Sequence, residues 1–342
     1  MIFALLLAIA PFSPVDVKPQ PAQVVWRSDV MPQASAMAGD TLILATGSRV
    51  VALDAATGAT KWEVLTKGNQ IVVDGDRVVI GGSDEVVIIA LHDGRVLFRR
   101  AMPEATNFLK GLPLVAASNG WPSHIYLLDR DGAVRAKRIV RHIESMWIAD
   151  GTIVVSSTAN AGLSEGPTVV AGFSTTDLAP LWKFNAFNAE LQKIAGRWYF
   201  GATPIADMFR LDPTTGHRGA AMPPKEPALD LDPRSTWEVE IDSLREWHRA
   251  RIRINDPATG HARWTVDLPF AVAATLSDGP HFYAAGLGDN DGIFIAEIDA
   301  ATGHVQRIYS GGGVLIDSLV RHGDLLIGIA LREGVVAIRL PR

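Results

Sequence analysis

Short runs of apolar residues, each followed by a tight polar turn, recur along most of the chain. The segment from Val50 to Trp62 reads VVALDAATGATKW, in which an apolar strand reaches Asp54, the chain turns at Gly58, and a second strand carries Trp62. Further copies of this frame, three close and three looser, begin at Met208, Arg251, Ile293, Val87, Ile125 and Val169. Seven copies of one strand–turn–strand unit predict a repeat protein built from β-hairpins.

The spacing of the turns gives the size of the repeat. Successive turn positions are 36, 38, 46, 38, 44 and 43 residues apart, a period typical of propeller blades. These positions are Gly58, Gly94, Gly132, Leu178, Gly216, Gly260 and Gly303. A second hairpin signal precedes most of them, at Gly39, Gly75, Gly151, Gly196, Gly279 and Gly323. Two hairpins per period predict four antiparallel strands per blade.

The chemistry of the turn supports this prediction. Glycine accepts the positive φ that ends a short loop, and an aspartate at the start of the loop can accept hydrogen bonds from backbone N–H groups. Large aromatic rings follow the turn on the outer strand, where we expect them to pack against a neighbouring blade rather than on a ligand. The residues that define the repeat are Asp54, Gly58, Trp62, Trp182, Asp212, Gly216, Asp256, Gly260, Trp264, Asp299 and Gly303.

The two ends of the chain complement each other. Residues 314–340 supply two hairpin-like segments but no fourth strand, whereas Val24–Arg27 resembles an outer strand without the three strands that should precede it. Pairing the N-terminal strand beside residues 335–340 would complete the last blade and remove exposed sheet edges. We therefore predict an all-β fold, a single closed β-propeller of eight four-stranded antiparallel blades over residues 22–342.

Composition and charge argue against several classes of function and site. Hydrophobic residues make up 48% of the chain, which also has 31 glycines, and this suits a strand-and-turn protein with a substantial core. The net charge of −5 and a pI near 6.0 give no electrostatic reason to expect nucleic acid as a partner. The chain has no cysteine, which excludes disulfides, thiolate metal sites, cysteine nucleophiles and a lipid-bearing cysteine.

The N-terminus resembles an export signal. Residues 1–10, MIFALLLAIA, form an apolar run of signal-peptide length that is too short to span a bilayer. No Lys or Arg precedes the run, so an uncleaved anchor or a misassigned start remains an alternative. Residues 11–21 contain four prolines and should form an extended linker. We expect a periplasmic or secreted protein without a transmembrane span in its mature domain.

The frame Ala52-Leu53-Asp54, Gly58, Trp62 resembles the tryptophan-docking motif of the PQQ-like repeat β-propellers. One branch of that family, the quinoprotein alcohol dehydrogenases, holds pyrroloquinoline quinone and Ca²⁺ in a central channel, usually beside a disulfide of adjacent cysteines. Another branch, the propeller lipoproteins of the outer-membrane β-barrel assembly machine, is noncatalytic and similar in size to this chain. The chain lacks the cysteines of either branch, and the resemblance carries over no cofactor-binding or partner-binding residue.

Three short motifs are candidates for catalytic or metal sites. Gly162–Gly166 matches the G-x-S-x-G nucleophile elbow around Ser164, but strand-like residues follow where the elbow needs a helix. Asp289–Gly292 offers oxygen ligands for Ca²⁺, yet Ala300 stands where an EF-hand loop has its glutamate. His217, His261 and His304 come directly after turn glycines, as surface residues of the repeat. We predict no catalytic, cofactor-binding or metal-binding residue.

The insertions into the repeat are the best candidates for a partner surface. They are 118–123, 159–167, 222–235 and 286–292, and strand order predicts that loops of these classes leave one face of a propeller, where insertions often bind partners. The predicted partner-binding residues are Trp121, Glu226, Leu229, Asp230, Leu231 and Asp232. Two basic runs are alternatives: Arg135, Lys137, Arg138 and Arg141 on a predicted edge strand, and 245–253, which the repeat does not orient.

The sequence thus favours an exported, non-enzymatic scaffold that binds a protein or an envelope polymer through this loop-rich face, without a cofactor. The alternative is a PQQ-dependent oxidoreductase that uses the central channel. A hydrolase or lyase carried by the loops is a third hypothesis, for which no acid and base residues can be paired.

Overall fold

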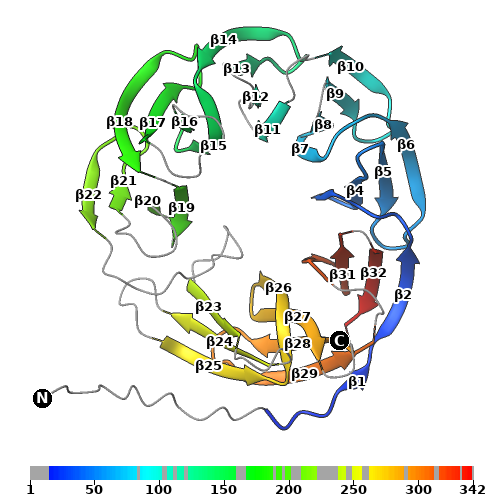
Figure 1. Cartoon of the computed structure of the whole chain (residues 1–342). Helices are drawn as coiled ribbons and strands as arrows, with labels where there is room; N and C mark the ends of the chain where they lie inside the picture. The colour runs from blue at the N-terminus through cyan, green and yellow to red at the C-terminus, as the bar shows by residue number, and fades with distance from the viewer. Residues whose placement is uncertain are drawn as a thin grey trace, which may run out of the picture. The chain divides into compact units, whose positions relative to one another are not determined.

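The structure consists of β-strands joined by turns and loops (Figure 1). The computed structural model describes residues 15–82, 85–101, 106–110, 114–118, 122–158, 167–187, 190–194, 197–201, 209–221, 238–243, 249–255, 262–288, 292–311, 316–331 and 333–340. These ranges contain 32 strands and no helix, which confirms the predicted all-β class. Within them, accordingly, no helix has the length and hydropathy needed to cross a membrane.

The chain divides into two compact units. The larger comprises residues 23–227 and 316–342, and the smaller comprises residues 1–22 and 228–315. In the larger unit, the described strands form six four-stranded sheets in which every pairing is antiparallel. Four strands per sheet is the blade that the sequence predicts.

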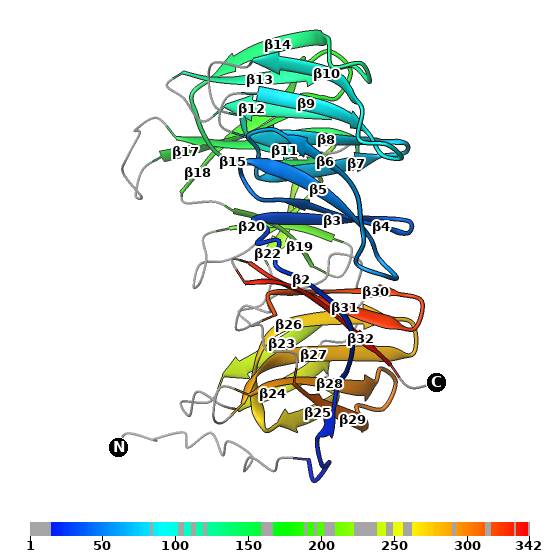
Figure 2. The same cartoon turned by 90° about the vertical axis from the view of Figure 1, so that its right-hand side faces the viewer.

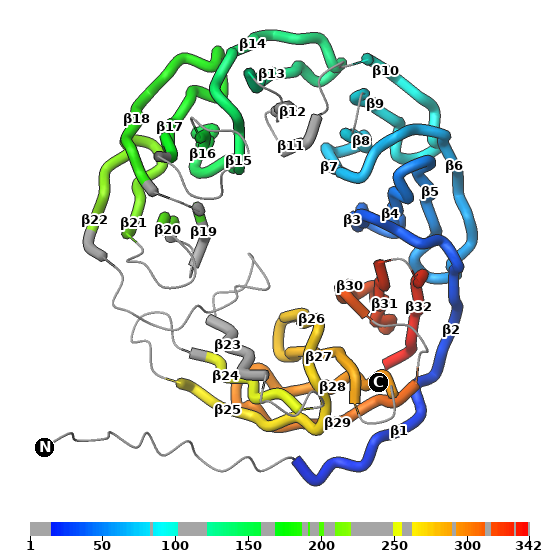
Figure 3. The backbone as a smooth tube through the Cα atoms, viewed as in Figure 1, coloured from blue at the N-terminus to red at the C-terminus, as the bar shows by residue number. Residues whose placement is uncertain are grey.

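Five of these sheets are meanders of consecutive strands, and the fourth strand of each is called its outer strand below (Figures 1 and 3). Their strands are β3 (Ala34–Ala38), β4 (Thr41–Ala45), β5 (Arg49–Asp54) and β6 (Thr60–Leu65); β7 (Gln70–Asp74), β8 (Arg77–Gly82), β9 (Glu85–Ala90) and β10 (Val96–Ala101); β11 (Thr106–Lys110), β12 (Leu114–Ser118), β13 (Ser123–Leu128) and β14 (Val134–Val140); β15 (His142–Ala149), β16 (Thr152–Thr158), β17 (Pro167–Ser174) and β18 (Pro180–Phe187); and β19 (Glu190–Ile194), β20 (Arg197–Gly201), β21 (Phe209–Leu211) and β22 (Arg218–Ala221).

The sixth sheet joins the two ends of the larger unit's chain. It contains β30 (Ser318–His322), β31 (Leu325–Ala330), β32 (Gly334–Arg339) and β2 (Gln23–Ser28). Strand β2 lies beside β32 (Figure 2). The two strands pair antiparallel, with Trp26 opposite Ala337. The N-terminal strand therefore takes the place of an outer strand that the C-terminal residues do not supply, which is the pairing that the sequence predicts.

Consecutive sheets of the larger unit pack face to face through apolar side chains. Between the β3–β6 and β7–β10 sheets, Ile43, Val50 and Trp62 pack with Val78 and Ile89. Similar clusters join the four remaining pairs of successive sheets in this unit. Central strands such as β4 and β9 are buried on both faces, which explains why they read as nearly unbroken apolar runs.

The smaller unit contains two sheets. One has β23 (Glu238–Ser243), β24 (Ala250–Asn255) and β25 (Ala262–Leu268), and residues 222–237, which precede β23, lie outside the described residues. The other has β26 (Phe270–Asp278), β27 (His281–Gly288), β28 (Ile293–Asp299) and β29 (Val305–Ser310), with β1 (Gln20–Pro21) added parallel to β29. Trp264, Phe270 and Phe282 form the centre of the core between them.

Residues 15–22 differ from the expected linker, because they are held against the smaller unit. The N–H of Val15 donates to the carbonyl of Asp267 at 3.2 Å, and that of Ala22 donates to the carbonyl of Ser310 at 2.8 Å. Val15 and Val17 pack on the core around Trp264. Extended, proline-rich backbone has unpaired polar groups, and β25 and β29, the last strands of the two sheets, offer partners for them. We call residues 15–22 the strap (Figure 3).

Candidate functional site

The repeat residues form hydrogen-bonded turns between the third and fourth strands. The Asp54 carboxylate accepts hydrogen bonds from the Thr57 hydroxyl at 2.8 Å and the Thr57 N–H at 3.0 Å. Asp299 makes the same two bonds with Thr302, both at 2.8 Å. The threonine hydroxyl is the largest cause of the lowered pKa of Asp54 and of Asp299. Asp212 forms a similar turn, whereas Asp256 and Gly260 lie outside the described residues.

Aromatic rings on outer strands lie on the turn of the neighbouring sheet within the same unit. The Trp62 indole N–H donates to the carbonyl of Leu91 at 2.7 Å, and Trp182 donates to Pro213 at 2.8 Å. In the smaller unit, Trp264 donates to Ala300 at 2.9 Å. All three indoles are buried or half-buried in inter-sheet cores. Their position between sheets gives them a packing role.

The predicted partner-binding residues Trp121, Glu226, Leu229, Asp230, Leu231 and Asp232 lie outside the described residues. Described strands border their segments: residues 119–122 connect β12 to β13, and residues 222–237 connect β22 to β23. In an antiparallel meander, the loop between the second and third strands and the exit from the fourth strand leave the same end of the sheet. The last residues of β12 and β22 therefore lie at that end of their respective sheets.

Buried hydroxyl groups line strands that lead into the predicted loops. The N–H of Ile143 donates to Ser123 Oγ at 3.0 Å, at the start of β13. Thr158 and Thr168 face each other across β16 and β17, and both are buried. Buried hydroxyl groups therefore lie at the ends of β13, β16 and β17 that border the 119–122 and 159–166 segments.

The basic runs have structural partners. Arg138 on outer strand β14 donates to the carbonyl of Leu178 at 3.0 Å, and its guanidinium lies 5.1 Å from the centre of the Phe173 ring. In the second run, Arg251 and Asp267 form a buried bidentate ion pair with N–O distances of 2.6 and 2.8 Å. Both arginines stabilise contacts between strands or sheets, and the sequence alone did not indicate the Arg251 pair.

The other two motifs lie largely outside the described residues. Residues 162–166 lie outside the described part, but β17 begins at Pro167, so a strand follows Ser164 where the nucleophile elbow has a helix. Of the 289–292 segment, Gly292 is described, and its carbonyl accepts a hydrogen bond from the N–H of Gly288 at 2.8 Å. The described residues contain no group of three His, Asp or Glu side chains that could hold a metal ion.

The smaller unit contains a buried polar cluster that the sequence did not indicate. Glu297 is 4% exposed and accepts hydrogen bonds from the Tyr309 hydroxyl at 2.8 Å and from Arg307 at 3.2 Å. His281 Nδ1 lies 3.2 Å from the other oxygen of the same carboxylate. Burial, followed by the hydrogen bond to Glu297, raises the pKa of Tyr309. These contacts tie β27, β28 and β29 together.

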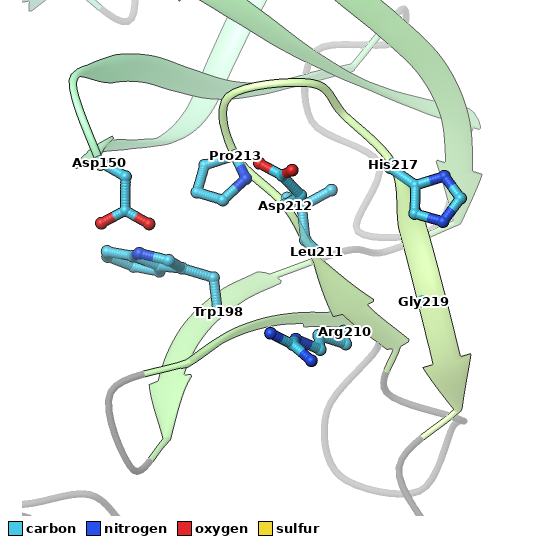
Figure 4. Close-up of a pocket in the computed structure, with 8 residues that line it drawn as sticks. All are labelled: Asp150, Trp198, Arg210, Leu211, Asp212, Pro213, His217 and Gly219. Carbon is cyan, nitrogen blue, oxygen red and sulfur yellow. The ribbon is translucent and has the colours of Figure 1, made fainter.

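A pocket of about 460 Å³ lies in the larger unit beside the turn between β21 and β22 (Figure 4). Asp150, Trp198, Arg210 and His217 line it, together with backbone and side chains of the 211–213 segment. Figure 4 shows the Asp150 carboxylate directed toward the Trp198 ring, with Arg210 and His217 at other sides of the pocket. The sequence signal that was missed is an indole and a guanidinium at the positions where the β3–β6 sheet has Leu42 and Ala52.

Comparisons with known proteins agree with this architecture. The family model described as outer membrane protein assembly factor BamB matches residues 15–218. BamB from Moraxella catarrhalis has a similar fold, with a TM-score of 0.59, 13% identity, and coverage of 93% of this chain and 100% of that chain. The computationally designed Ika8 protein (TM-score 0.63, 12% identity, 94% and 100% coverage) and Saccharomyces cerevisiae Sqt1 (0.62, 12%, 94% and 100%) are also similar. No curated protein matches the chain significantly.

Proposed function

Because the chain belongs to the BamB family of PQQ-like repeat β-propellers, we propose that it is a scaffold that binds a protein partner. The family match over residues 15–218 is the observation that carries this proposal. The matching family is that of an outer membrane protein assembly factor, so the proposed partner is another component of outer-membrane protein assembly. The inter-sheet positions of the repeat tryptophans are consistent with a rigid platform rather than a ligand-stacking site.

The proposal includes a single closed ring of eight blades. It is supported by the eight sheets among the described residues, by the pairing of β2 with β32, and by the similarity to the BamB β-propeller. Small-angle X-ray scattering of the purified protein tests this arrangement. A closed disc and two units joined by flexible connections give different radii of gyration, and the latter result would contradict the ring.

The proposed contact surface is the loop-rich face that bears Trp121 and residues 226–232. Replacing residues 223–234 with a short Gly-Ser linker should preserve folding, since closure entropy changes slowly with loop length. Binding to the purified periplasmic domains of outer-membrane assembly components from the same organism should fall. A matched control shortens the turn at residues 55–57, where Asp54 and Gly58 organise a hairpin, and should reduce stability more than binding per folded molecule.

Two further parts of the proposal have direct tests. We propose a non-enzymatic protein without a cofactor. Saturable binding of pyrroloquinoline quinone with Ca²⁺, accompanied by dye-linked alcohol oxidation, would contradict this and favour the quinone-dependent alternative. We also propose export to the periplasm or beyond. Mass spectrometry of the mature N-terminus after cell fractionation tests it, and a cytoplasmic protein that retains residues 1–10 would contradict it.

A further inference from the structure

The pocket beside Trp198 departs from the repeat at a core position. Trp198 is the second residue of β20 and pairs with Leu211, just as Leu42 of β4 pairs with Leu53 in another sheet. Leu42 is completely buried, whereas Trp198 is only partly buried and forms part of the pocket wall. A large indole with an accessible surface therefore replaces an aliphatic core residue at this site.

Arg210 likewise differs from the corresponding residues of two other sheets in the larger unit. It directly precedes Leu211 on β21, and the residues in the corresponding register, Ala52 on β5 and Ile88 on β9, are buried. Arg210 is exposed at the pocket, beside Gly219. No hydrogen-bond acceptor or carboxylate for its guanidinium occurs among the described residues. A guanidinium left without a partner can accept a carboxylate in bidentate geometry.

Asp150 is the third departure, in the turn between β15 and β16. Asp150 and Gly151 both have positive φ, of 47° and 77°, and Asp-Gly is a common pair for such a hairpin turn. Three other hairpins between first and second strands of the larger unit have the order Gly-Asp, at Gly39-Asp40, Gly75-Asp76 and Gly323-Asp324.

The aspartates of those three turns have partners, whereas Asp150 has none among the described residues. Asp76 lies 2.6 Å from Arg130, Asp324 lies 3.4 Å from Arg339, and Asp40 lies 3.7 Å from His322. In the part of the chain that the structure describes, the Asp150 carboxylate has no hydrogen-bond or ion-pair partner. It is instead directed toward the Trp198 ring (Figure 4).

We propose that this pocket binds a peptide segment of a partner protein that carries one basic and one acidic side chain. A Lys or Arg side chain of the peptide lies over the Trp198 ring and pairs with Asp150, since a cation there gains both an ion pair and a cation–π contact. The acidic side chain of the peptide pairs with Arg210. A pocket of about 460 Å³ has the volume of a small-ligand site and accommodates these two side chains.

Opposite unpaired charges in one pocket favour a peptide over a neutral sugar. An oligosaccharide could also stack on an indole, but it would leave the full charges of Asp150 and Arg210 without counter-ions. The inference rests on the proposed function only in assigning the ligand to a protein. The turns that form the pocket lie at the end of their sheets opposite the loops between second and third strands, so this contact is separate from the loop-rich face.

The test uses NMR of the full-length protein labelled with ¹⁵N. The indole N–H signal of Trp198 is assigned by its loss in Trp198→Phe. It is then followed during titration with Ac-Lys-Ala-Ala-Glu-NH₂ and Ac-Glu-Ala-Ala-Lys-NH₂, with Ac-Gln-Ala-Ala-Gln-NH₂ as the neutral peptide and maltotriose as the sugar. We expect a saturable shift with at least one charged peptide, and weaker binding at higher salt.

Variants connect that shift to the two charged side chains. Asp150→Asn and Arg210→Gln should each weaken peptide binding about tenfold, the size expected for losing one charge-assisted hydrogen bond. Asp76→Asn, at a turn where the carboxylate is already paired, is the matched control and should leave binding unchanged. The proposal is wrong if neither charged peptide gives a saturable shift, if the neutral peptide binds equally well, or if only maltotriose binds.

The outcomes separate this pocket from the loop-rich face. Peptide binding that persists after replacement of residues 223–234 shows that the pocket is independent of the proposed loop surface. If that replacement leaves partner binding intact while Asp150→Asn reduces it, the loop surface is wrong and the pocket is retained. If loop replacement abolishes partner binding and the pocket binds no peptide, the loop surface is retained and the pocket proposal is wrong.

Discussion

The indole of Trp62 lies directly on Gly94 of the next sheet. A Cβ atom built on Gly94 would come within 2.7 Å of the ring, and Gly94 also has a φ of 73°. The turn therefore needs glycine for two reasons, the backbone conformation and the space for the ring. The same relationship joins Trp26 to Gly58, Phe98 to Gly132, Trp182 to Gly216 and Trp264 to Gly303.

Trp62→Ala should destabilise the larger unit by about 3 to 5 kcal/mol, the usual cost of truncating a buried aromatic residue. Denaturant unfolding measures the change. Leu65→Ala is the matched control on the same strand, because Leu65 is 73% exposed and its truncation should alter stability by less than about 0.5 kcal/mol. Equal effects of the two substitutions would show that Trp62 does not hold the sheets together.

Gly94→Ala should also be destabilising, and its effect should depend on Trp62. Part of the cost, about 1 to 2 kcal/mol, comes from the left-handed backbone and is independent of the ring. The remainder comes from the clash of the new methyl group with Trp62 and should disappear in Trp62→Ala. A double-mutant cycle measures this coupling. Additive effects would mean that the ring moves aside at no cost.

One turn has leucine instead of glycine, and the neighbouring sheet shows why. Leu178 occupies the turn position between β17 and β18 with a φ of 60°, although leucine is strained in that conformation. The outer strand of the preceding sheet carries Ala136 four residues after its turn glycine, where Trp62 stands in its own repeat. In place of a ring from that strand, the Leu178 side chain itself is buried in the inter-sheet core.

Leu178→Gly should therefore lower stability, although it relieves a strained backbone. Losing a buried leucine side chain costs about 2 to 5 kcal/mol, which exceeds the strain of about 1 to 2 kcal/mol. Adding Ala136→Trp should restore part of the loss by supplying the missing ring. Thermal unfolding of the two single variants and the double variant measures this. A double variant less stable than Leu178→Gly alone would contradict the proposed exchange of ring for side chain.

The repeat could be predicted from sequence because its signals are local. Asp54, Thr57 and Gly58 interact within one turn, so their spacing carries the information, and Leu178 was recognised by its period although it is not glycine. The strap could not be predicted, because prolines indicate extended backbone but not what that backbone contacts. Its hydrogen bonds run from Val15 to Asp267 and from Ala22 to Ser310, pairs remote in sequence.

The pocket escaped prediction for a related reason. Trp198 and Arg210 look unremarkable in a strand, and only the register that pairs Trp198 with Leu211 shows that aliphatic core positions have been replaced. Asp150 lies in an ordinary Asp-Gly turn, and Trp198, which lines the same pocket, belongs to the next sheet. The predicted partner residues were chosen from insertions instead, and their role stays a prediction.

Acid should destabilise the repeat turns. Hydrogen bonds from threonine hydroxyls lower the pKa of Asp54, Asp212 and Asp299 in the folded state. Groups whose folded pKa is depressed contribute stability above the unfolded pKa, about 3.9, and that contribution is lost as pH falls through the lowered folded pKa. The melting temperature should therefore fall below about pH 4.

The triple variant Asp54→Asn, Asp212→Asn, Asp299→Asn tests the source of this acid sensitivity. Asparagine keeps a side-chain acceptor but does not titrate. The variant should show a shallower decline of melting temperature between about pH 4 and pH 2 than the natural protein. An identical decline would assign the acid sensitivity to other carboxylates.

The strap and β2 should stabilise different units, although they are adjacent in sequence. A chain that begins at Gln23 lacks the strap contacts of Val15 and Ala22 with the outer strands β25 and β29. A chain that begins at Met31 also lacks β2, with its buried Trp26 paired opposite Ala337. A chain that begins at Val15 retains both and is the control.

Hydrogen exchange measured by mass spectrometry distinguishes the two contributions, because it reports local opening of each strand. Starting at Gln23 should speed exchange in β25 and β29 while β31 and β32 keep their protection. Starting at Met31 should additionally speed exchange in β32, which loses its hydrogen-bonded neighbour, and in the turn at residues 54–58 on which Trp26 packs. Unchanged exchange in β29 after removal of the strap would mean that its two backbone hydrogen bonds and the packing of Val15 and Val17 contribute nothing to the smaller unit.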